Sequence, residues 1–230
     1  MPTGRWWRGD LTGRRYRVRR PLDSEDTRAT VRLLRALGTR VERRGDTWLL
    51  IPAPDRPSRS RLIDCGESGT TLRFAVPLTA LSARPARMTG APRLGARPLA
   101  PLLRAVRRLG ARVEAEGPSR GGLPLRVQGP IHAGSISLPV SESSQFASAL
   151  FLTLPTLAGA SRVRLMGTLV SEPYLDATLA VLRFHGVEAK RDGRVFSTPG
   201  HQQYRGNRFP IPHGRFLGGL PVGRGRRFRG

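Results

Sequence analysis

A cluster of hydroxyl and amide side chains precedes the most apolar stretch of the chain. The cluster reads Ser141-Glu-Ser-Ser-Gln145, and residues 146–160 favour a helix directly after it. Free backbone N–H groups and the helix dipole make a helix N-terminus a favourable place for an anion. One serine suffices to cap a helix, whereas Ser143, Ser144 and Gln145 together exceed that need. The sequence therefore predicts an anion site at this helix start.

A second polar cluster has a similar arrangement. Residues 64–73 read Asp-Cys-Gly-Glu-Ser-Gly-Thr-Thr-Leu-Arg and lead into another apolar stretch. Gly66 and Gly69 lack a Cβ atom, so a ligand can approach the backbone closely here. Glu67 would repel a bound phosphate unless it points away or pairs with an arginine, and we assign it no role.

A third cluster, Ser171-Glu-Pro-Tyr174, opens a later helix, and Pro173 suits the first turn of that helix. Arg93 and Arg97 lie in the loop before an earlier helix of the same pattern. If the units that carry these segments stack side by side, their helix starts converge at one end of the domain. The sequence predicts a polar, arginine-bearing anion site at that end.

The elements that must position these clusters recur along the chain. An apolar-striped helix, a glycine and a short strand pair occur three times, and the intervals between the glycines are 72 and 76 residues. Each glycine stands where a helix ends in a left-handed residue, a conformation that costs glycine little. The three glycines are Gly38, Gly110 and Gly186.

A second helix recurs between these copies. Ser68 and Ser143 open two helices rich in small apolar residues, 75 residues apart, and each leads to a strand that ends in Gly90 or Gly167. The unit is therefore strand, helix, strand, helix and two strands. One period before Ser68, the matching helix of the first unit would fall at about residue −7. The sequence predicts an α/β (α+β) fold of three βαβαββ repeats, of which the first is incomplete.

Apolar side chains at helical spacing are explained by packing alone. They lie on one face of each predicted helix, and we give them no catalytic role. Asp192-Gly193 stands between short β-compatible stretches and predicts a hairpin. The helical sets are Ala29, Leu33 and Leu37; Leu99, Leu102, Leu103, Val106 and Leu109; and Leu175, Leu179 and Leu182.

Composition narrows the class of protein. With 230 residues and 38% apolar content, the chain can bury a core. Its single cysteine, Cys65, excludes an intramolecular disulfide and a zinc cluster of the usual kind. Residues 146–160 are too short and too interrupted to span a bilayer. We expect a cytoplasmic protein without a membrane partner.

The charge is concentrated at the two ends. The formal net charge is +24, and residues 1–20 and 201–230 supply 13 of it. Because the central part carries only +11, we do not expect a nucleic-acid partner, although Arg, Gly and Phe interleaved near the C-terminus can bind RNA by charge and stacking. The alternative is that both ends are out-of-frame or truncated sequence joined to the repeats.

Four segments occur in the order and spacing of 5-enolpyruvylshikimate-3-phosphate synthases, also called 3-phosphoshikimate 1-carboxyvinyltransferases. They are residues 64–73, 90–98, 141–146 and 170–179. The chain resembles a fragment of this family that covers nearly one of its two lobes. The resemblance implies three βαβαββ units around a pseudo-threefold axis.

The resemblance also suggests a division of the chain. Residues 1–12 are a basic segment that we leave unassigned, and residues 13–212 form an enolpyruvyl-transferase-like substrate-binding lobe. Residues 213–230 are an Arg/Gly-rich tail that we expect to be disordered.

The family transfers the enolpyruvyl group of phosphoenolpyruvate to the 5-hydroxyl of shikimate 3-phosphate in the shikimate pathway, which leads to chorismate and the aromatic amino acids. The resemblance implies these two substrates as ligands, no cofactor and no metal. By matching position, the residues that resemble shikimate 3-phosphate contacts are Ser143, Ser144, Gln145, Ser171 and Tyr174. Those that resemble phosphoenolpyruvate contacts are Gly69, Arg97 and Gln145.

Two parts of the family pattern have no counterpart in this sequence. The N-terminal Lys-Ser motif and its arginine are not reproduced by residues 6–15. The second lobe, which in the family carries the acid–base carboxylates, is not matched beyond Pro212, so the catalytic residues stay unknown. We therefore expect a substrate-binding lobe with little or no turnover by itself, and a second lobe is the protein partner that the resemblance implies.

Two alternatives stay open at this point. The related enolpyruvyl transferase of cell-wall synthesis shares the chemistry but uses a nucleotide sugar, UDP-N-acetylglucosamine. An RNA 3′-terminal phosphate cyclase, or a basic RNA-binding module, would use similar repeats together with the Arg-rich ends. The segments Ser-Ser-Gln-Phe (143–146) and Val-Ser-Glu-Pro-Tyr (170–174) favour the shikimate enzyme.

Overall fold

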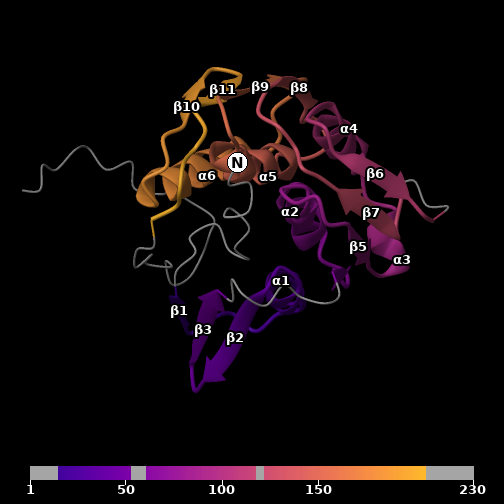
Figure 1. The fold of residues 1–230 in the computed structure, drawn as a ribbon, viewed down its shortest axis with the longest axis vertical. Coiled ribbons are helices and arrows are strands. Elements are labelled where there is room, and N and C mark those ends of the chain that lie inside the picture. Colours follow the sequence, from indigo (N-terminus) through magenta and orange to yellow (C-terminus); the bar gives the residue numbers. More distant parts are fainter. Residues whose placement is uncertain (1–14, 53–60, 118–121, 206–230) are drawn as a thin grey trace, which may run out of the picture.

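Three small sheets surround a group of helices (Figure 1). The structure is a computed structural model that describes residues 15–52, 61–117 and 122–205. Figure 1 shows the sheets on three sides, with α1, α2, α5 and α6 between them. This is the arrangement expected from a pseudo-threefold repeat.

The first sheet is the smallest. Its strands lie in the order β1-β3-β2, and both neighbouring pairs are antiparallel. Helix α1 links β1 to the β2–β3 hairpin. Among the described residues this unit has one helix, as expected for an incomplete first repeat. The elements are β1 (Tyr16–Arg19), α1 (Glu25–Ala36), β2 (Thr39–Arg44) and β3 (Thr47–Pro52).

The second unit contains the complete pattern. Its strands lie in the order β4-β5-β7-β6, with β4 parallel to β5 and the other pairs antiparallel. The loop that we expected around Arg93 also contains a one-turn helix, α3, which begins at Pro92. The elements are β4 (Leu62–Asp64), α2 (Gly69–Thr79), β5 (Ala86–Thr89), α3 (Pro92–Gly95), α4 (Ala100–Arg108), β6 (Arg112–Ala115) and β7 (Leu125–Gln128).

The third unit repeats the second. Its sheet has the order β10-β11-β9-β8, and β8 is parallel to β9. The predicted hairpin at Asp192-Gly193 is confirmed, since Asp192 pairs with Val195 across the turn. The elements are β8 (Ser135–Pro139), α5 (Gln145–Thr153), the 3₁₀ turn η1 (Leu154–Thr156), β9 (Ser161–Met166), α6 (Glu172–Phe184), β10 (Lys190–Asp192) and β11 (Val195–Thr198).

The three predicted helix-ending glycines are confirmed. Each has a positive φ, and its N–H donates to the carbonyl oxygen three residues earlier at 3.0 Å. In the first two copies, an arginine of the last turn also donates to the strand that follows: Arg35 to the Val41 oxygen at 3.1 Å and Arg107 to the Val113 oxygen at 2.7 Å. The φ values are 97° at Gly38, 110° at Gly110 and 71° at Gly186.

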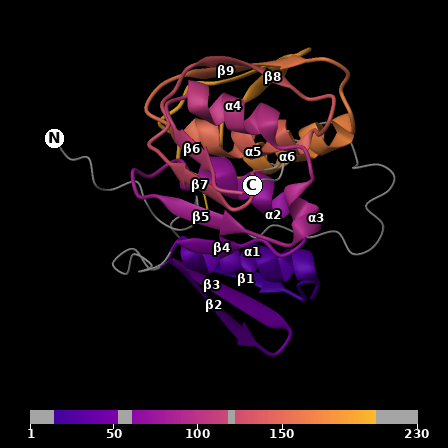
Figure 2. The same ribbon diagram turned by 90° about the vertical axis from the view of Figure 1, so that its right-hand side faces the viewer.

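One continuous hydrophobic core joins the units. Figure 2 shows α4, α5 and α6 beneath β8 and β9, and α1 above β2 and β3. Helix α2 packs against α1, α4 and α5, and α5 packs against α6. Phe151 of α5 stacks on Phe196 of β11, with 3.8 Å between ring centroids. Because α2 and α5 occupy the centre, their N-termini are held in a fixed relation to each other.

The predicted end segments, 1–12 and 213–230, lie outside the described residues. Within the described ranges, no helix has both the length and the apolar character needed to cross a membrane.

Candidate functional site

The first turn of helix α2 is capped by a side chain. Ser68 precedes the helix in extended backbone conformation, and its Oγ accepts the N–H of Thr71 at 3.1 Å. A serine at this position satisfies one of the free N–H groups of the first turn. Since the turn contains no acidic residue, its remaining N–H groups and the positive end of the dipole favour an anion.

Two arginines converge on the first residue of this helix, Gly69. A Cβ atom at Gly69 would lie 2.7 Å from Nη1 of Arg97 and 3.3 Å from Nη1 of Arg73. Only glycine leaves these guanidinium groups room to approach the backbone. The predicted residues Gly69 and Arg97 therefore lie close together, and the Arg73 side chain also lies close to Gly69.

A short hydrogen-bond chain crosses from the second repeat to the third. Arg73 donates from Nη1 to Oε1 of Gln145 at 2.7 Å, and Gln145 donates from Nε2 to Oγ1 of Thr70 at 3.1 Å. The Arg73 guanidinium also lies 5.4 Å from the ring centroid of Phe146. These contacts fix the orientation of the Gln145 amide and place it beside Arg73, whose Nη1 also approaches Gly69.

The charge of this cluster is not neutralised by a carboxylate. No ion pair of Arg73 or Arg97 with an acidic side chain occurs among the described residues. Burial lowers the pKa of Arg73, the nearby charge of Arg97 lowers it further, and Glu142 acts in the opposite direction. Two guanidinium groups with the same charge would be stabilised by an anion between them.

The start of α5 supplies the predicted hydroxyl groups. The Ser143 Oγ accepts the backbone N–H of Gln145 at 3.2 Å. Ser144 is the N-cap residue by position, but its side chain makes no capping bond, and it is 6% exposed. The Ser143 hydroxyl thus serves the first turn of the helix, whereas the Ser144 hydroxyl makes no capping bond.

The start of α6 is built differently. Ser171 is left-handed, with φ 57°, and makes no side-chain capping bond, while Tyr174 is 54% exposed. The loop before α6 lies beside the loop before α5, because the Thr168 N–H donates to Ser141 Oγ at 3.1 Å. Ser171 and Tyr174 are thus near the α5 start, but among the described residues no hydrogen bond or ion pair joins them to Gln145, Arg73 or Arg97.

Two further residues of the sequence motifs lie at the surface. Glu67 is exposed and forms no ion pair within the described residues. Arg93 is exposed at the start of α3. Neither residue belongs to the cluster around Gly69.

Thr70 and Arg73 belong to the candidate cluster, and sequence reasoning did not name them among its site residues. Thr70 stands one residue and Arg73 four residues after Gly69, inside the motif at 64–73. That spacing places Gly69 and Arg73 on the same side of the first helical turn, and this signal could have identified Arg73. The contact of both residues with Gln145 depends on the packing of α2 against α5, which the spacing alone does not specify.

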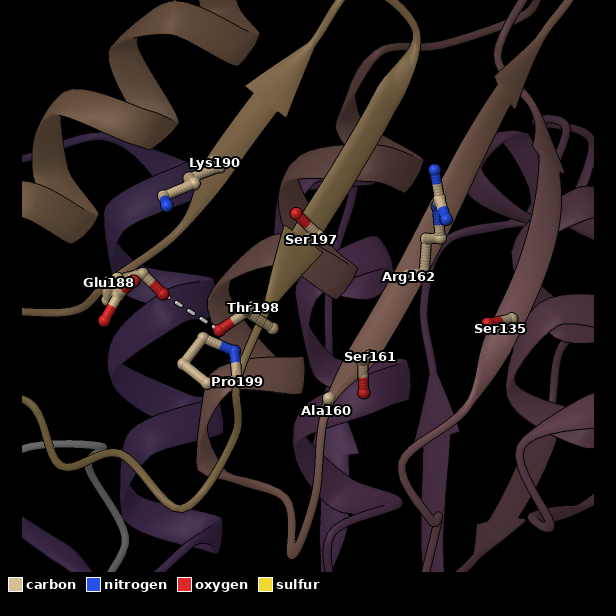
Figure 3. Close-up of a pocket in the computed structure, with 9 residues that line it drawn as sticks. All are labelled: Ser135, Ala160, Ser161, Arg162, Glu188, Lys190, Ser197, Thr198 and Pro199. Atoms are coloured by element: carbon tan, nitrogen blue, oxygen red, sulfur yellow. Dashed lines mark hydrogen bonds between the residues drawn. The ribbon is translucent and has the colours of Figure 1, made fainter.

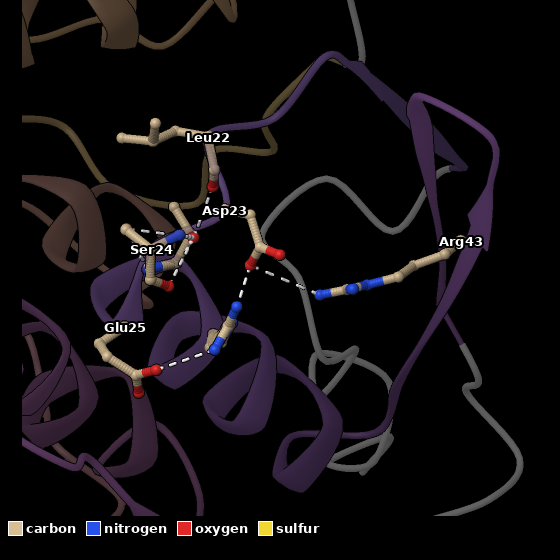
Figure 4. A network of polar contacts seen from close by, with 7 residues as sticks. Leu22, Asp23, Ser24, Glu25 and Arg43 are labelled. Atoms are coloured by element: carbon tan, nitrogen blue, oxygen red, sulfur yellow. Dashed lines mark hydrogen bonds and ion pairs between the residues drawn. The ribbon is translucent and has the colours of Figure 1, made fainter.

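The start of α1 carries acidic groups that are already paired (Figure 4). Asp23 accepts from Arg28 at 2.8 Å and lies 3.8 Å from Arg43, and Glu25 accepts from Arg28 at 3.0 Å. The hydrogen bond from Arg28 lowers the pKa of Asp23. Ser24 and Thr27 complete a capping box. This network stabilises the helix start and leaves little positive charge for a ligand.

A pocket of about 390 Å³ lies elsewhere, along the third sheet (Figure 3). It contains none of the predicted site residues. Thr198 donates to the backbone oxygen of Glu188 at 3.0 Å within it. Because the charged and hydroxyl groups that match a phosphate ligand lie at the starts of α2 and α5, we place the candidate site there. The pocket is lined by Ser135, Ala160, Ser161, Arg162, Glu188, Lys190, Ser197, Thr198 and Pro199.

Comparison with known proteins supports one of the three sequence-based readings. A sequence model of the EPSP synthase (3-phosphoshikimate 1-carboxyvinyltransferase) family matches residues 10–214. The 3-phosphoshikimate 1-carboxyvinyltransferase of Methanothrix thermoacetophila is 40% identical over 197 residues, which are 85% of this chain and 46% of that protein. That of Halobacterium salinarum is 37% identical over 198 residues, again 85% of this chain and 46% of that protein.

Solved structures share the fold. EPSP synthase from Acinetobacter baumannii matches with a TM-score of 0.69 and 22% identity, over 86% of this chain and 44% of that chain. The chain thus spans about half the length of the relatives it matches. These matches support the shikimate reading over the cell-wall transferase and RNA cyclase alternatives. The chain belongs to the EPSP synthase family, the 3-phosphoshikimate 1-carboxyvinyltransferases.

Proposed function

We propose that residues 13–212 form a substrate-binding lobe for shikimate 3-phosphate and phosphoenolpyruvate, and that the complete site performs enolpyruvyl transfer in the cytoplasm. The observation that carries the proposal is the convergence of Arg97 and Arg73 on Gly69, with Gln145 hydrogen-bonded to Arg73. This cluster offers two cations at the helix N-terminus, together with an amide that is hydrogen-bonded to one of them. Such a set of donors suits a multiply charged phosphate ester.

Phosphoenolpyruvate is the ligand that best suits the arginine side of the site. Its phosphate and carboxylate are both anionic, and a guanidinium group can bind either of them through two N–H donors. Gly69 lets this ligand reach the free N–H groups of the α2 start. Arg97 is the predicted phosphoenolpyruvate contact, and Arg73, which also approaches Gly69, holds the Gln145 amide.

Shikimate 3-phosphate suits the hydroxyl side of the site. Ser143 and Ser144 stand at the α5 start, where the helix dipole favours the 3-phosphate group. Ser171 and Tyr174 of the neighbouring α6 start provide hydroxyl donors for the same ligand. Gln145 lies between the two sides and can contact both substrates.

In the proposed reaction, the 5-hydroxyl group of shikimate 3-phosphate loses its proton to a base as its oxygen bonds to C2 of phosphoenolpyruvate, and C3 gains a proton from an acid, which gives a tetrahedral intermediate. The tetrahedral intermediate then loses a proton from C3 and expels phosphate, which restores the C2–C3 double bond. The lobe contributes binding, orientation and stabilisation of negative charge. Among the described residues, the cluster around Gly69 contains no carboxylate to transfer these protons. We therefore infer little turnover by residues 1–230 alone. The second lobe of the family is the partner that would complete the site.

A calorimetric titration with shikimate 3-phosphate tests the proposal. Saturable heat from the chain, weakened at least about tenfold in Gln145→Ala and in Ser144→Ala, would support it. Gln128→Ala is the matched control, because Gln128 donates to the Ala83 oxygen on the second sheet, outside the cluster. No heat from a folded chain, or equal weakening by Gln128→Ala, would contradict a specific site at the helix starts.

A further inference from the structure

Arg191 of β10 is the least exposed arginine among the ion pairs of the described residues. Its side chain is 12% exposed, whereas those of the other paired arginines are 35–72% exposed. Its Nη2 donates to the Glu172 carboxylate, its Nη1 to Oδ1 of Asp176 at 3.2 Å, and its Nε to the Gly193 oxygen at 3.0 Å. All three guanidinium nitrogens therefore have acceptors, and this rigid fork is little screened by solvent.

The two carboxylates that Arg191 contacts belong to the start of α6. Glu172 and Asp176 are four residues apart, so they lie on one face of the helix, where like charges repel each other. Their side chains are 52% and 62% exposed. Glu172 directly follows Ser171, so its charge lies within one Debye length, about 10 Å at 0.1 M salt, of an anion bound at Ser171. Arg191 therefore offsets negative charge that would otherwise repel such an anion.

The β10–β11 hairpin also holds the loop that leads into α6. Arg194, in the turn of the hairpin, donates from Nη1 to the Gly167 oxygen. On α6 itself, the Thr178 Oγ1 donates to the Ser148 Oγ of α5 at 2.8 Å. The start of α6 is thus attached to the hairpin through two arginines and to α5 through a pair of hydroxyl groups. These attachments determine where residues 170–174 lie, because all five are exposed to solvent.

Comparison of the repeats connects this arginine with acidic helix starts. The position five residues after the helix-ending glycine is Arg43 in the first unit, Ala115 in the second and Arg191 in the third. Arg43 lies 3.8 Å from Asp23, just before α1 (Figure 4). The first turns of α1 and α6 contain acidic residues, whereas that of α4 contains none. The arginine thus occurs in the two units whose helix starts carry carboxylates, and alanine takes its place in the remaining unit.

We propose that Arg191 is a positioning residue for the shikimate 3-phosphate side of the site. It holds the first two turns of α6 against the hairpin, and it offsets the charges of Glu172 and Asp176 beside the hydroxyl groups of Ser171 and Tyr174. The inference rests on the proposed function for its ligand, but the attachment of α6 can be measured without a ligand. The electrostatic role predicts that removal of the two carboxylates compensates for loss of the arginine.

Calorimetric titration of the full chain with shikimate 3-phosphate tests the electrostatic role. Arg191→Met should weaken binding about tenfold at low salt and less at about 0.5 M salt, where charge repulsion is screened. Addition of Glu172→Gln and Asp176→Asn to Arg191→Met should return the affinity to within about threefold of the wild type, because no uncompensated charge remains. Arg43→Met is the matched control, since it removes the equivalent arginine of the first unit, and it should leave the affinity unchanged.

Hydrogen exchange without ligand tests the attachment of α6. Residues 176–180 should exchange about tenfold faster in Arg191→Met than in the wild type or in Arg43→Met. Unchanged exchange, an equal loss of affinity in Arg43→Met, or no recovery in the triple variant would overturn the proposal. If Arg191→Met fails to fold, Arg191→Gln removes the charge while keeping a hydrogen-bond donor.

The two measurements separate this inference from the proposed function. If the wild type binds shikimate 3-phosphate and Arg191→Met binds it equally well, the positioning role fails while the proposed function stands. If the wild type binds no shikimate 3-phosphate, the proposed function fails and the positioning role with it, whereas faster exchange in Arg191→Met would still establish the attachment of α6 to the hairpin.

Discussion

The start of α2 and the start of α6 are two halves of one proposed site, and they are built in opposite ways. At α2, Ser68 caps the helix, and Gly69 lies under two guanidinium groups. At α6, Ser171 is left-handed without a side-chain cap, and Tyr174 is largely exposed. The first half is closed and positively charged, whereas the second is open to solvent.

The difference follows from what each start packs against. The α2 start is held by α5 through Arg73, Thr70 and Gln145. The first turn of α6 contributes only Leu175 to the buried core, and Glu172 pairs with Arg191 of β10. A ligand group that binds at α2 finds its donors already positioned, whereas one that binds at α6 must first order exposed hydroxyls. The phosphoenolpyruvate side should therefore contribute more affinity than the α6 hydroxyls.

Thiol reactivity should show the largest contrast between the two starts. Burial raises the pKa of Cys65, just before α2, to about 12 from its usual 9.0. A raised thiol pKa keeps the proton on sulfur, so the thiolate fraction at pH 8 falls about a thousandfold. We expect slow reaction with a disulfide reagent in the wild type and fast reaction of Ser171→Cys in a Cys65→Ser background.

The raised pKa of Cys65 also determines how the stability of the protein changes with pH. The unfolded thiol ionises near pH 9 while the folded thiol stays protonated to about pH 12. The stability that Cys65 contributes is therefore present below pH 9 and is lost as the pH rises from 9 to 12. Fast reaction of Cys65 with the disulfide reagent in the native protein would contradict the prediction, because it would show that the residues just before α2 are accessible to solvent.

Arg73→Met should weaken shikimate 3-phosphate or phosphoenolpyruvate binding about 10- to 100-fold, because it removes a charged hydrogen bond to Gln145 and one of two cations. Tyr174→Phe, at the open start, should weaken binding less than about tenfold. Titration calorimetry measures both, and Arg104→Met on the exposed side of α4 serves as the control. A larger loss in Tyr174→Phe than in Arg73→Met would reverse the ranking of the two halves.

Gly69→Ala should weaken phosphoenolpyruvate binding about tenfold with a change in unfolding free energy below about 1 kcal/mol. The added Cβ would contact the ends of two flexible arginine side chains rather than backbone, so the arginines move while the fold persists. Gly134→Ala is the matched control, because its nearest neighbour would be a Leu109 carbon at 3.7 Å. Unchanged affinity in Gly69→Ala would mean that phosphoenolpyruvate binding does not depend on the present positions of Arg73 and Arg97.

The smallest effects concern helix stability. Ser68→Ala should reduce the unfolding free energy by about 1 kcal/mol, since it removes the cap of α2. Ser171→Gly should instead increase it by about 0.5–1 kcal/mol, because glycine adopts the left-handed conformation with less strain. Urea denaturation of both variants measures the two free energies of unfolding. A change of the same sign in Ser68→Ala and Ser171→Gly would contradict the proposed difference between the starts of α2 and α6.

Much of the fold could be predicted from the sequence because its signals are local. Gly38, Gly110 and Gly186 mark the helix ends by their conformational freedom, and Asp192-Gly193 marks a hairpin. Both signals depend on the backbone preferences of a few consecutive residues. The repeat interval then orders the elements without any knowledge of their contacts.

The candidate site could be predicted only in part. Its polar residues stand out where helix capping does not explain them, as at Ser144. The contact of Arg73 with Gln145 joins residues 72 positions apart, and it exists because α2 and α5 pack together with their starts aligned. Helix packing and side-chain direction decide such a contact, and neither can be derived from spacing within one helix.

The hydrogen-bond chain through Gln145 also affects how the protein unfolds. It ties the second and third repeats together at the point where α2 and α5 already share the core. The first repeat is joined to the second mainly at α1, through Thr30 to Thr71 and Arg32 to Asp64. The second and third repeats should therefore open as one cooperative unit, while the sheet of the first repeat opens at a lower free energy. A ligand that bridges the starts of α2 and α5 would widen this gap, because its binding energy is lost when the larger unit opens and retained when the first sheet opens alone.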